Sequence, residues 1–117
     1  MQSKLSNLEI NIQMNWLLDF YGGLLTEKQQ EILGLYYEED FSLAEIAEQC
    51  NVSRQNIHDI IQRATRHLQN YEEALHLVER TLQASERLNQ ALQSLQEKKY
   101  TQTAQYIENA IGQLEGE

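Results

Sequence analysis

The sequence contains no proline, one cysteine and few aromatic side chains among its 117 residues. Because proline breaks helices, its absence removes a strong local obstacle to long helices. The single cysteine, Cys50, cannot form an internal disulfide, and a lone cysteine is usually buried and inert. No run approaches the roughly 20 apolar residues of a membrane span, and the N-terminus MQSKLSNLEI lacks the apolar stretch of a signal peptide. These absences predict a cytoplasmic protein that does not act on a membrane.

Basic residues are also scarce and unevenly placed. Nine lysines and arginines face 18 aspartates and glutamates, which gives a net charge of −9. Residues 1–53 carry −7 and residues 71–117 carry −4, whereas residues 54–70 carry +2. An acidic surface repels polyanions. Binding of a nucleic acid would therefore have to centre on the short basic segment, and it would be opposed by the rest of the chain.

What the sequence does contain favours helices throughout. Gln, Glu, Leu and Ala are abundant, and no strand-like alternation of polar and apolar residues appears. We expect an all-α fold with three parts packed as one compact unit. These parts are an N-terminal helical arm over residues 1–23, a helix-turn-helix module over residues 24–70 and a C-terminal helical extension over residues 71–117.

The arm carries one apolar stripe at spacings of three and four residues, which predicts a buried helix face: Leu5, Leu8, Ile12, Trp16 and Phe20. Gly22 and Gly23 predict its end, because paired glycines are costly inside a helix. Five aromatic residues are expected to join the arm to the module, in preference to forming a base-stacking platform: Trp16, Phe20, Tyr21, Tyr36 and Tyr37.

Capping patterns predict the helix starts of the module. Thr26 with Gln29, and Ser42 with Glu45, have the spacing of capping boxes. After the second helix comes Asn51, one of the few residue types that tolerate a left-handed backbone.

Ser53 can cap a third helix, which should bury an apolar stripe on one side: Ile57, Ile61, Ala64 and Leu68. A short helix, a tight turn and a longer capped helix are what many proteins use to read the DNA major groove. The polar front of the third helix gives the candidate nucleic-acid-binding residues: Ser53, Arg54, Gln55, Asn56, His58, Asp59, Gln62, Arg63 and Arg66. The alternative is that this front is merely a solvated helix face. Nearby Ile60 is expected to pack against other helices rather than to contact a base.

The segment LLTEKQQEILGLYYEEDFSLAEIAEQCNVSRQNIHDIIQRATRHL resembles the fourth region of bacterial sigma factors. The upstream MNWLLDFYGGLLT, together with LYYEEDFSLAEIAE, VSRQ and QNYEEAL, narrows the resemblance to the YlxM-like helix-turn-helix proteins, over about residues 12–75. The resemblance implies a sigma region 4-like fold and a regulatory role connected with the signal recognition particle pathway. It also implies that Ser53, Arg54 and Gln55 start the recognition helix, with Asp59 and Arg63 inside it.

This chain departs from the family pattern on the recognition helix. The family usually has an aromatic residue, a polar residue and a lysine where this sequence has His58, Ile60 and Gln62. The basic face of this helix is therefore poorer than the resemblance would imply.

The C-terminal part continues the helical period from Tyr71 to about Leu95, with an apolar series at Leu75, Val78, Leu82, Leu88, Leu92 and Leu95. Thr101 is the expected cap of a last helix with the stripe Ala104, Ile107, Ile111 and Leu114. We expect an antiparallel hairpin of these two helices. The long leucine series also predicts a homo-oligomer formed through the C-terminal helices.

Nothing in the sequence resembles a catalytic constellation, so we expect a protein that is not an enzyme and has no cofactor. His58, His67 and His76 are nine residues apart, so neighbours fall on opposite faces of a helix and a metal site is not expected. The leading hypothesis is a regulatory protein that binds DNA or RNA, with signal recognition particle RNA as one candidate target. It also allows binding to protein components of the signal recognition particle pathway. The alternative is an acidic protein-interaction adaptor in which the helix-turn-helix is only a scaffold.

Overall fold

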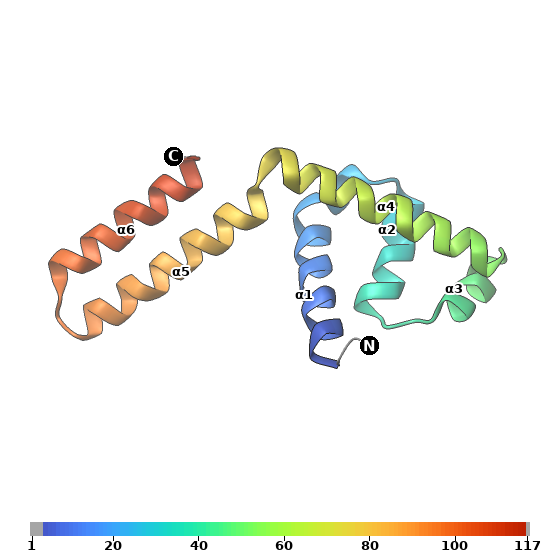
Figure 1. Cartoon of the computed structure of the whole chain (residues 1–117), viewed down its shortest axis with the longest axis horizontal. Helices are drawn as coiled ribbons and strands as arrows, with labels where there is room; N and C mark the ends of the chain where they lie inside the picture. Colours follow the sequence, from blue (N-terminus) through green and yellow to red (C-terminus); the bar gives the residue numbers. More distant parts are fainter. Residues whose placement is uncertain (1–3, 117) are drawn as a thin grey trace. The chain divides into compact units, whose positions relative to one another are not determined.

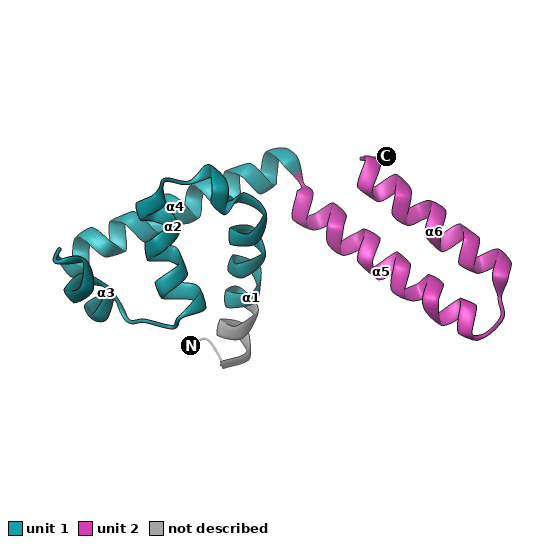
Figure 2. Ribbon diagram, turned by 180° about the vertical axis from the view of Figure 1, so that it is seen from behind, with its two compact units in different colours: residues 1–75 teal, residues 76–117 magenta. Residues whose placement is uncertain are grey.

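A computed structural model describes the backbone of residues 4–116 and the side chains of residues 10–116. Every regular element in this part of the chain is helical, which confirms the all-α fold. The chain divides into two compact units, residues 1–75 and residues 76–117 (Figure 2). None of the helices in residues 4–116 combines the length and the apolar character needed to cross a membrane.

Unit 1 contains four α-helices joined by short turns (Figure 1). In chain order its elements are α1 (Lys4–Tyr21), the 3-10 turn η1 (Gly22–Leu24), α2 (Glu27–Leu33), the π-helical turn η2 (Gly34–Glu38), α3 (Leu43–Cys50) and α4 (Arg54–Leu75). The other three helices of unit 1, α1, α2 and α3, all contact α4. The long helix α4 therefore serves as the support on which the rest of unit 1 is assembled.

The core of unit 1 lies along one side of α4. The predicted stripe of α4 is confirmed, since all four of its residues are buried: Ile57, Ile61, Ala64 and Leu68. Ile32 and Leu33 of α2 and Ile46 of α3 are also completely buried. Burying a side chain of this size stabilises the fold by about 1.5–3 kcal/mol. The opposite side of α4 is thereby fixed as the exposed one.

The predicted stripe of the arm is wrong where the structure tests it. Ile12 is 54% exposed, and Trp16 and Phe20 are only half-buried, whereas Met14 and Tyr21 are buried. The cause is the contact between α1 and α4: the Tyr21 ring lies 6.0 Å from that of Tyr71, and the Tyr21 hydroxyl donates a hydrogen bond to the Glu72 carboxylate. These contacts turn a different face of α1 inward. Leu5 and Leu8 lie outside the described side chains.

The aromatic residues of unit 1 contact one another. Trp16 and Phe20 stack with ring centroids 6.1 Å apart, and Tyr36 meets Tyr37 edge-to-face at 4.9 Å. Burial raises the pKa of Tyr37 above its ordinary value, an effect that the nearby Thr65 hydroxyl partly offsets. With Tyr21 buried and the other four half-buried, these rings serve packing, as expected.

Unit 2 is an antiparallel hairpin of α5 (Leu77–Gln96) and α6 (Tyr100–Glu115), as predicted (Figure 2). The expected continuous helix from Tyr71 to Leu95 is wrong, because the backbone breaks at His76, which has a left-handed φ of 56°. We expected residues 71–117 to form one unit with the rest, whereas residues 76–117 form a unit of their own. Helix α6 begins at Tyr100, with Lys99 in place of Thr101 at its N-cap.

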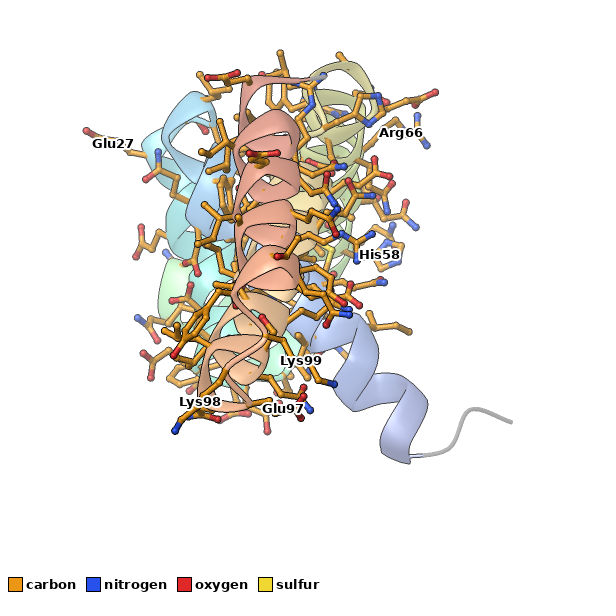
Figure 3. The ribbon with its side chains drawn as sticks, turned by 90° about the vertical axis from the view of Figure 1, so that its left-hand side faces the viewer. Glu27, His58, Arg66, Glu97, Lys98 and Lys99 are labelled. Carbon is orange, nitrogen blue, oxygen red and sulfur yellow. The ribbon has the colours of Figure 1, made fainter. Side chains whose placement is uncertain are left out.

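The predicted leucine stripes do not form the seam of the hairpin. The buried residues between α5 and α6 are small: Ala84, Ala91, Ser94, Thr103 and Ala110. The Ser94 and Thr103 hydroxyls share a hydrogen bond across the hairpin, and Thr103 also donates to the Lys99 carbonyl at 3.1 Å. Small side chains allow two helices to approach closely, which leaves the larger leucines outside the seam. Lys98 and Lys99 lie at the turn between the two helices (Figure 3).

Candidate nucleic-acid interface

Both predicted capping boxes are present, and they fix where α2 and α3 begin. The Thr26 hydroxyl accepts a hydrogen bond from the Gln29 N–H at 3.1 Å, and the Gln29 side chain accepts one from the Thr26 N–H at 3.1 Å. Ser42 and Glu45 form the same reciprocal pair at 3.1 and 3.0 Å. The Ser42 backbone N–H, and then its hydroxyl, hold the pKa of the Glu45 carboxyl below its ordinary value.

The turn between α3 and α4 has the predicted geometry. Asn51 is left-handed, with φ 57° and ψ 45°, and its N–H donates to the carbonyls of Ala47 and Glu48. The Val52 N–H donates to the Ala47 carbonyl at 3.1 Å, and the Ser53 hydroxyl accepts from the Asn56 N–H at 3.0 Å. Three residues, 51–53, therefore separate the end of α3 from the start of α4. This is the spacing of a helix-turn-helix.

The front of α4 faces away from the core of unit 1. Most of the predicted site residues are exposed: Ser53, Arg54, Gln55, Asn56, Asp59, Gln62, Arg63 and Arg66. His58 is half-buried, and so is Ile60, which agrees with packing rather than base contact for Ile60. In Figure 3, His58 and Arg66 project from the same side of unit 1, and Glu27 projects from the opposite side.

Helical geometry divides this front into a centre and two edges. Since each residue turns an α-helix by about 100°, Gln55, Asp59, Gln62 and Arg66 lie roughly opposite the buried stripe. Arg54 and His58 fall on one edge, where they line a shallow hollow with Leu43 of α3. Arg63 and Asn56 fall on the other edge. Arginines therefore border both sides of a polar central strip.

The arginines of this front are available to a ligand. Among the residues that the structure describes, no carboxylate lies within 4.0 Å of the side-chain nitrogens of Arg54, Arg63 or Arg66. The one acidic residue on the front, Asp59, accepts a hydrogen bond from the Gln55 amide at 2.9 Å and lies 3.7 Å from His58 Nδ1. Asp59 thus orients a neighbouring amide and leaves the guanidinium groups unpaired.

Sequence reasoning missed two residues that border the front. Leu43 belongs to α3, and Tyr37 of η2 lines a second hollow together with Gln62 and Arg66. Both lie far from α4 in the sequence, so the period of α4 alone carried no signal for them. The free Cys50 is half-buried at the end of α3, outside either hollow.

Comparison with known proteins agrees with this architecture. The family model described as "UPF0122: Putative helix-turn-helix protein, YlxM / p13 like" matches residues 8–110. A UPF0122 protein of Desulforamulus reducens is 52% identical over 83 residues, which cover 71% of this chain and 71% of that protein.

Two other relatives extend the similarity over most of the chain. A UPF0122 protein of Clostridium botulinum is 39% identical over 100 residues, 86% of this chain and 92% of the relative. One from Halalkalibacterium halodurans is 40% identical over 108 residues, 92% of this chain and 99% of the relative. The match includes both the helix-turn-helix and most of the C-terminal hairpin. The chain belongs to the UPF0122 family of YlxM/p13-like helix-turn-helix proteins.

Proposed function

We propose that this chain is a regulatory nucleic-acid-binding protein that uses the exposed front of α4 as its recognition surface. The observation that carries the proposal is the set of unpaired arginines on both edges of a polar strip. Membership of a helix-turn-helix family supports it. The proposed contact residues are those predicted from the sequence: Ser53, Arg54, Gln55, Asn56, His58, Asp59, Gln62, Arg63 and Arg66.

The positions of the side chains on this front suggest which of them contact phosphates and which contact bases. A helix that enters the major groove has a phosphate backbone on either side and base edges in front of it. Arg54 and Arg63, on opposite edges, are placed to meet the two backbones. Gln55 and Gln62, in the centre, are placed to meet base edges, and the bond from Gln55 to Asp59 restricts the Gln55 amide before binding.

Affinity should be modest and strongly dependent on salt. Each neutralised phosphate contributes about −0.9 to the slope of log K against log salt, so three arginines give a slope of roughly −3. From 50 to 200 mM salt, that slope corresponds to a loss of about 40-fold. Unit 1 as a whole is acidic, with five basic and twelve acidic residues in residues 1–75, which opposes binding further.

Helix geometry favours duplex DNA as the target, whereas the family resemblance favours signal recognition particle RNA. The width of an α-helix suits the major groove of B-DNA, whereas the deep, narrow major groove of duplex RNA excludes side chains. The family resemblance implies a role in the signal recognition particle pathway. If the target is signal recognition particle RNA, α4 must approach a loop or bulge of that RNA, where bases are accessible.

The test compares two triple variants that change the net charge equally. In one, Arg54, Arg63 and Arg66 become Gln; in the other, the exposed Lys28, Lys98 and Lys99 become Gln. Fluorescence anisotropy at 50 mM salt measures binding to a labelled DNA duplex and to labelled signal recognition particle RNA. We expect the arginine variant to lose at least tenfold in affinity for the bound target, and the lysine variant to stay within about twofold.

Equal losses in the two variants would show that net charge, and not the front of α4, governs binding. No binding of the unmodified protein to either target would overturn the proposal. The acidic adaptor would then be the better reading.

A further inference from the structure

The hairpin of unit 2 has two exposed sides of opposite character. The hydrogen bond between Ser94 and Thr103 fixes which sides of α5 and α6 face each other. The register is supported at the other end of the hairpin, where a Cβ on Gly116 would lie 3.3 Å from Cζ of Arg80. In an antiparallel pair, the positions immediately after the seam residues turn to the same side on both helices, by about 100° each.

On that side lies an apolar surface that we call the leucine face, formed by six residues: Leu88, Leu92, Leu95, Ile107, Ile111 and Leu114. Their exposed fractions range from 40% for Ile107 to 59% for Leu114. On each helix the spacing alternates between three and four residues, the pattern of helices that pack in bundles.

The other side of the hairpin is polar. Gln90 and Gln93 of α5 and Gln102 of α6 line one shared hollow there, together with Glu97, Lys99, Tyr106 and the seam residue Ser94. The shared lining places the glutamines of the two helices on one side. The hairpin is therefore a two-helix layer with a glutamine side and a leucine side.

We propose that the leucine face is the dimerisation surface of this protein, and that it binds the leucine face of a second copy to form a four-helix bundle. The largest apolar patch of a typical monomer covers roughly 300–600 Å² and is often functional, and six half-exposed leucines and isoleucines reach this range. Two such faces bring the contact close to the roughly 1,200 Å² at which stable interfaces begin. Because the seam of each hairpin is made of small residues, the leucines are left to form the larger core between copies.

Charge favours a second copy over a charged partner. Residues 76–117 hold four basic and six acidic side chains, so unit 2 is nearly neutral, whereas residues 1–75 carry −7. The leucine face itself contains no charged residue. It therefore offers nothing that selects a strongly basic or acidic protein, and the C-terminal units of two copies repel each other little.

Sedimentation equilibrium of the full-length protein at about 100 μM, with no nucleic acid present, tests this proposal separately from the proposed function. We expect twice the chain mass of 13.7 kDa. The double variant Leu92→Gln, Ile111→Gln should be monomeric. Four apolar side chains leave the dimer interface, and at about tenfold each dimerisation should weaken by about ten-thousandfold.

Leu82→Gln is the matched control, since Leu82 is 43% exposed on α5 but points away from the leucine face. This variant should remain dimeric. If the double variant loses helicity, Ala104→Glu replaces it. Ala104 is exposed on α6 three residues before Ile107, so the change adds a charge next to the leucine face and removes no packing. A monomeric unmodified protein at 100 μM, or a face variant that still dimerises, would overturn the proposal.

Discussion

The turn that positions α4 depends on the left-handed backbone of Asn51. A left-handed conformation costs an ordinary residue about 1–2 kcal/mol, which Asn reduces and Gly avoids. Both backbone bonds of the turn, from the N–H groups of Asn51 and Val52, remain in any variant. We therefore expect Asn51→Ala to lower the free energy of unfolding by about 1 kcal/mol, and Asn51→Gly to leave it unchanged or slightly higher.

Urea denaturation followed by Trp16 fluorescence measures this effect in unit 1, because Trp16 is the only tryptophan and belongs to α1. With a slope of about 1–3 kcal/mol per M urea, a loss of 1 kcal/mol lowers the midpoint by roughly 0.3–1 M. The control is Asn70→Ala, an exposed position inside α4, where Ala is the better helix former and no loss is expected.

Equal destabilisation by Asn51→Gly and Asn51→Ala would refute the reasoning, since it would mean that the Asn51 side chain, and not its backbone conformation, supports the turn. An unchanged Asn51→Ala variant would refute it as well. Asn51→Gly should also retain nucleic-acid binding, because it preserves the position of α4.

Three further predictions concern the support of α4 and its titratable neighbours. Leu68→Ala should lower the free energy of unfolding by about 2–5 kcal/mol in the same urea assay, because Leu68 is fully buried. The pKa of Glu45 is lowered in the folded state, so its contribution to stability is present above pH 4.5 and is lost as pH falls through the folded pKa. In Glu45→Gln, the free energy of unfolding measured by circular dichroism should therefore fall less steeply over this acidic range. The pKa of Tyr37 is raised, so its contribution to stability is present below pH 10 and is lost as pH rises through the folded pKa. Tyr37→Phe should remove one phenol that ionises above pH 10 in an ultraviolet titration.

The helix-turn-helix was predictable because its signals are local. A capping box, a left-handed Asn and an apolar period each depend on residues within a few positions of one another. Thr26, Ser42, Asn51 and Ser53 all act where the sequence placed them. The exposed front of α4 followed from the burial of its back.

The wrong predictions concern features that depend on contacts between residues far apart in the sequence. The face of α1 that turns inward is set by Tyr21 meeting Tyr71 and Glu72, which are about 50 residues away along the chain. In the hairpin, Ser94 and Thr103 bond across a seam of small residues, which the period of the leucines did not predict. The break at His76 was missed because a single histidine inside a continuous helical period is a weak signal, although histidine is enriched among left-handed residues.

The availability of the arginines is also a property of the tertiary structure. The sequence places nine acidic residues before position 54, any of which could have paired with Arg54, Arg63 or Arg66. In the described part of the chain, none of these acids lies within 4.0 Å of the side-chain nitrogens of the three arginines.

The salt dependence of binding tests the central claim most directly. Anisotropy titrations of labelled duplex DNA and signal recognition particle RNA, between 50 and 200 mM salt, give the slope of log K against log salt. We predict binding at 50 mM salt with a slope of roughly −3 for one α4 front, rising toward −5 if the two fronts of a dimer act together. A slope near zero, or no binding to either target at 50 mM salt, would contradict the claim that the front of α4 binds nucleic acid.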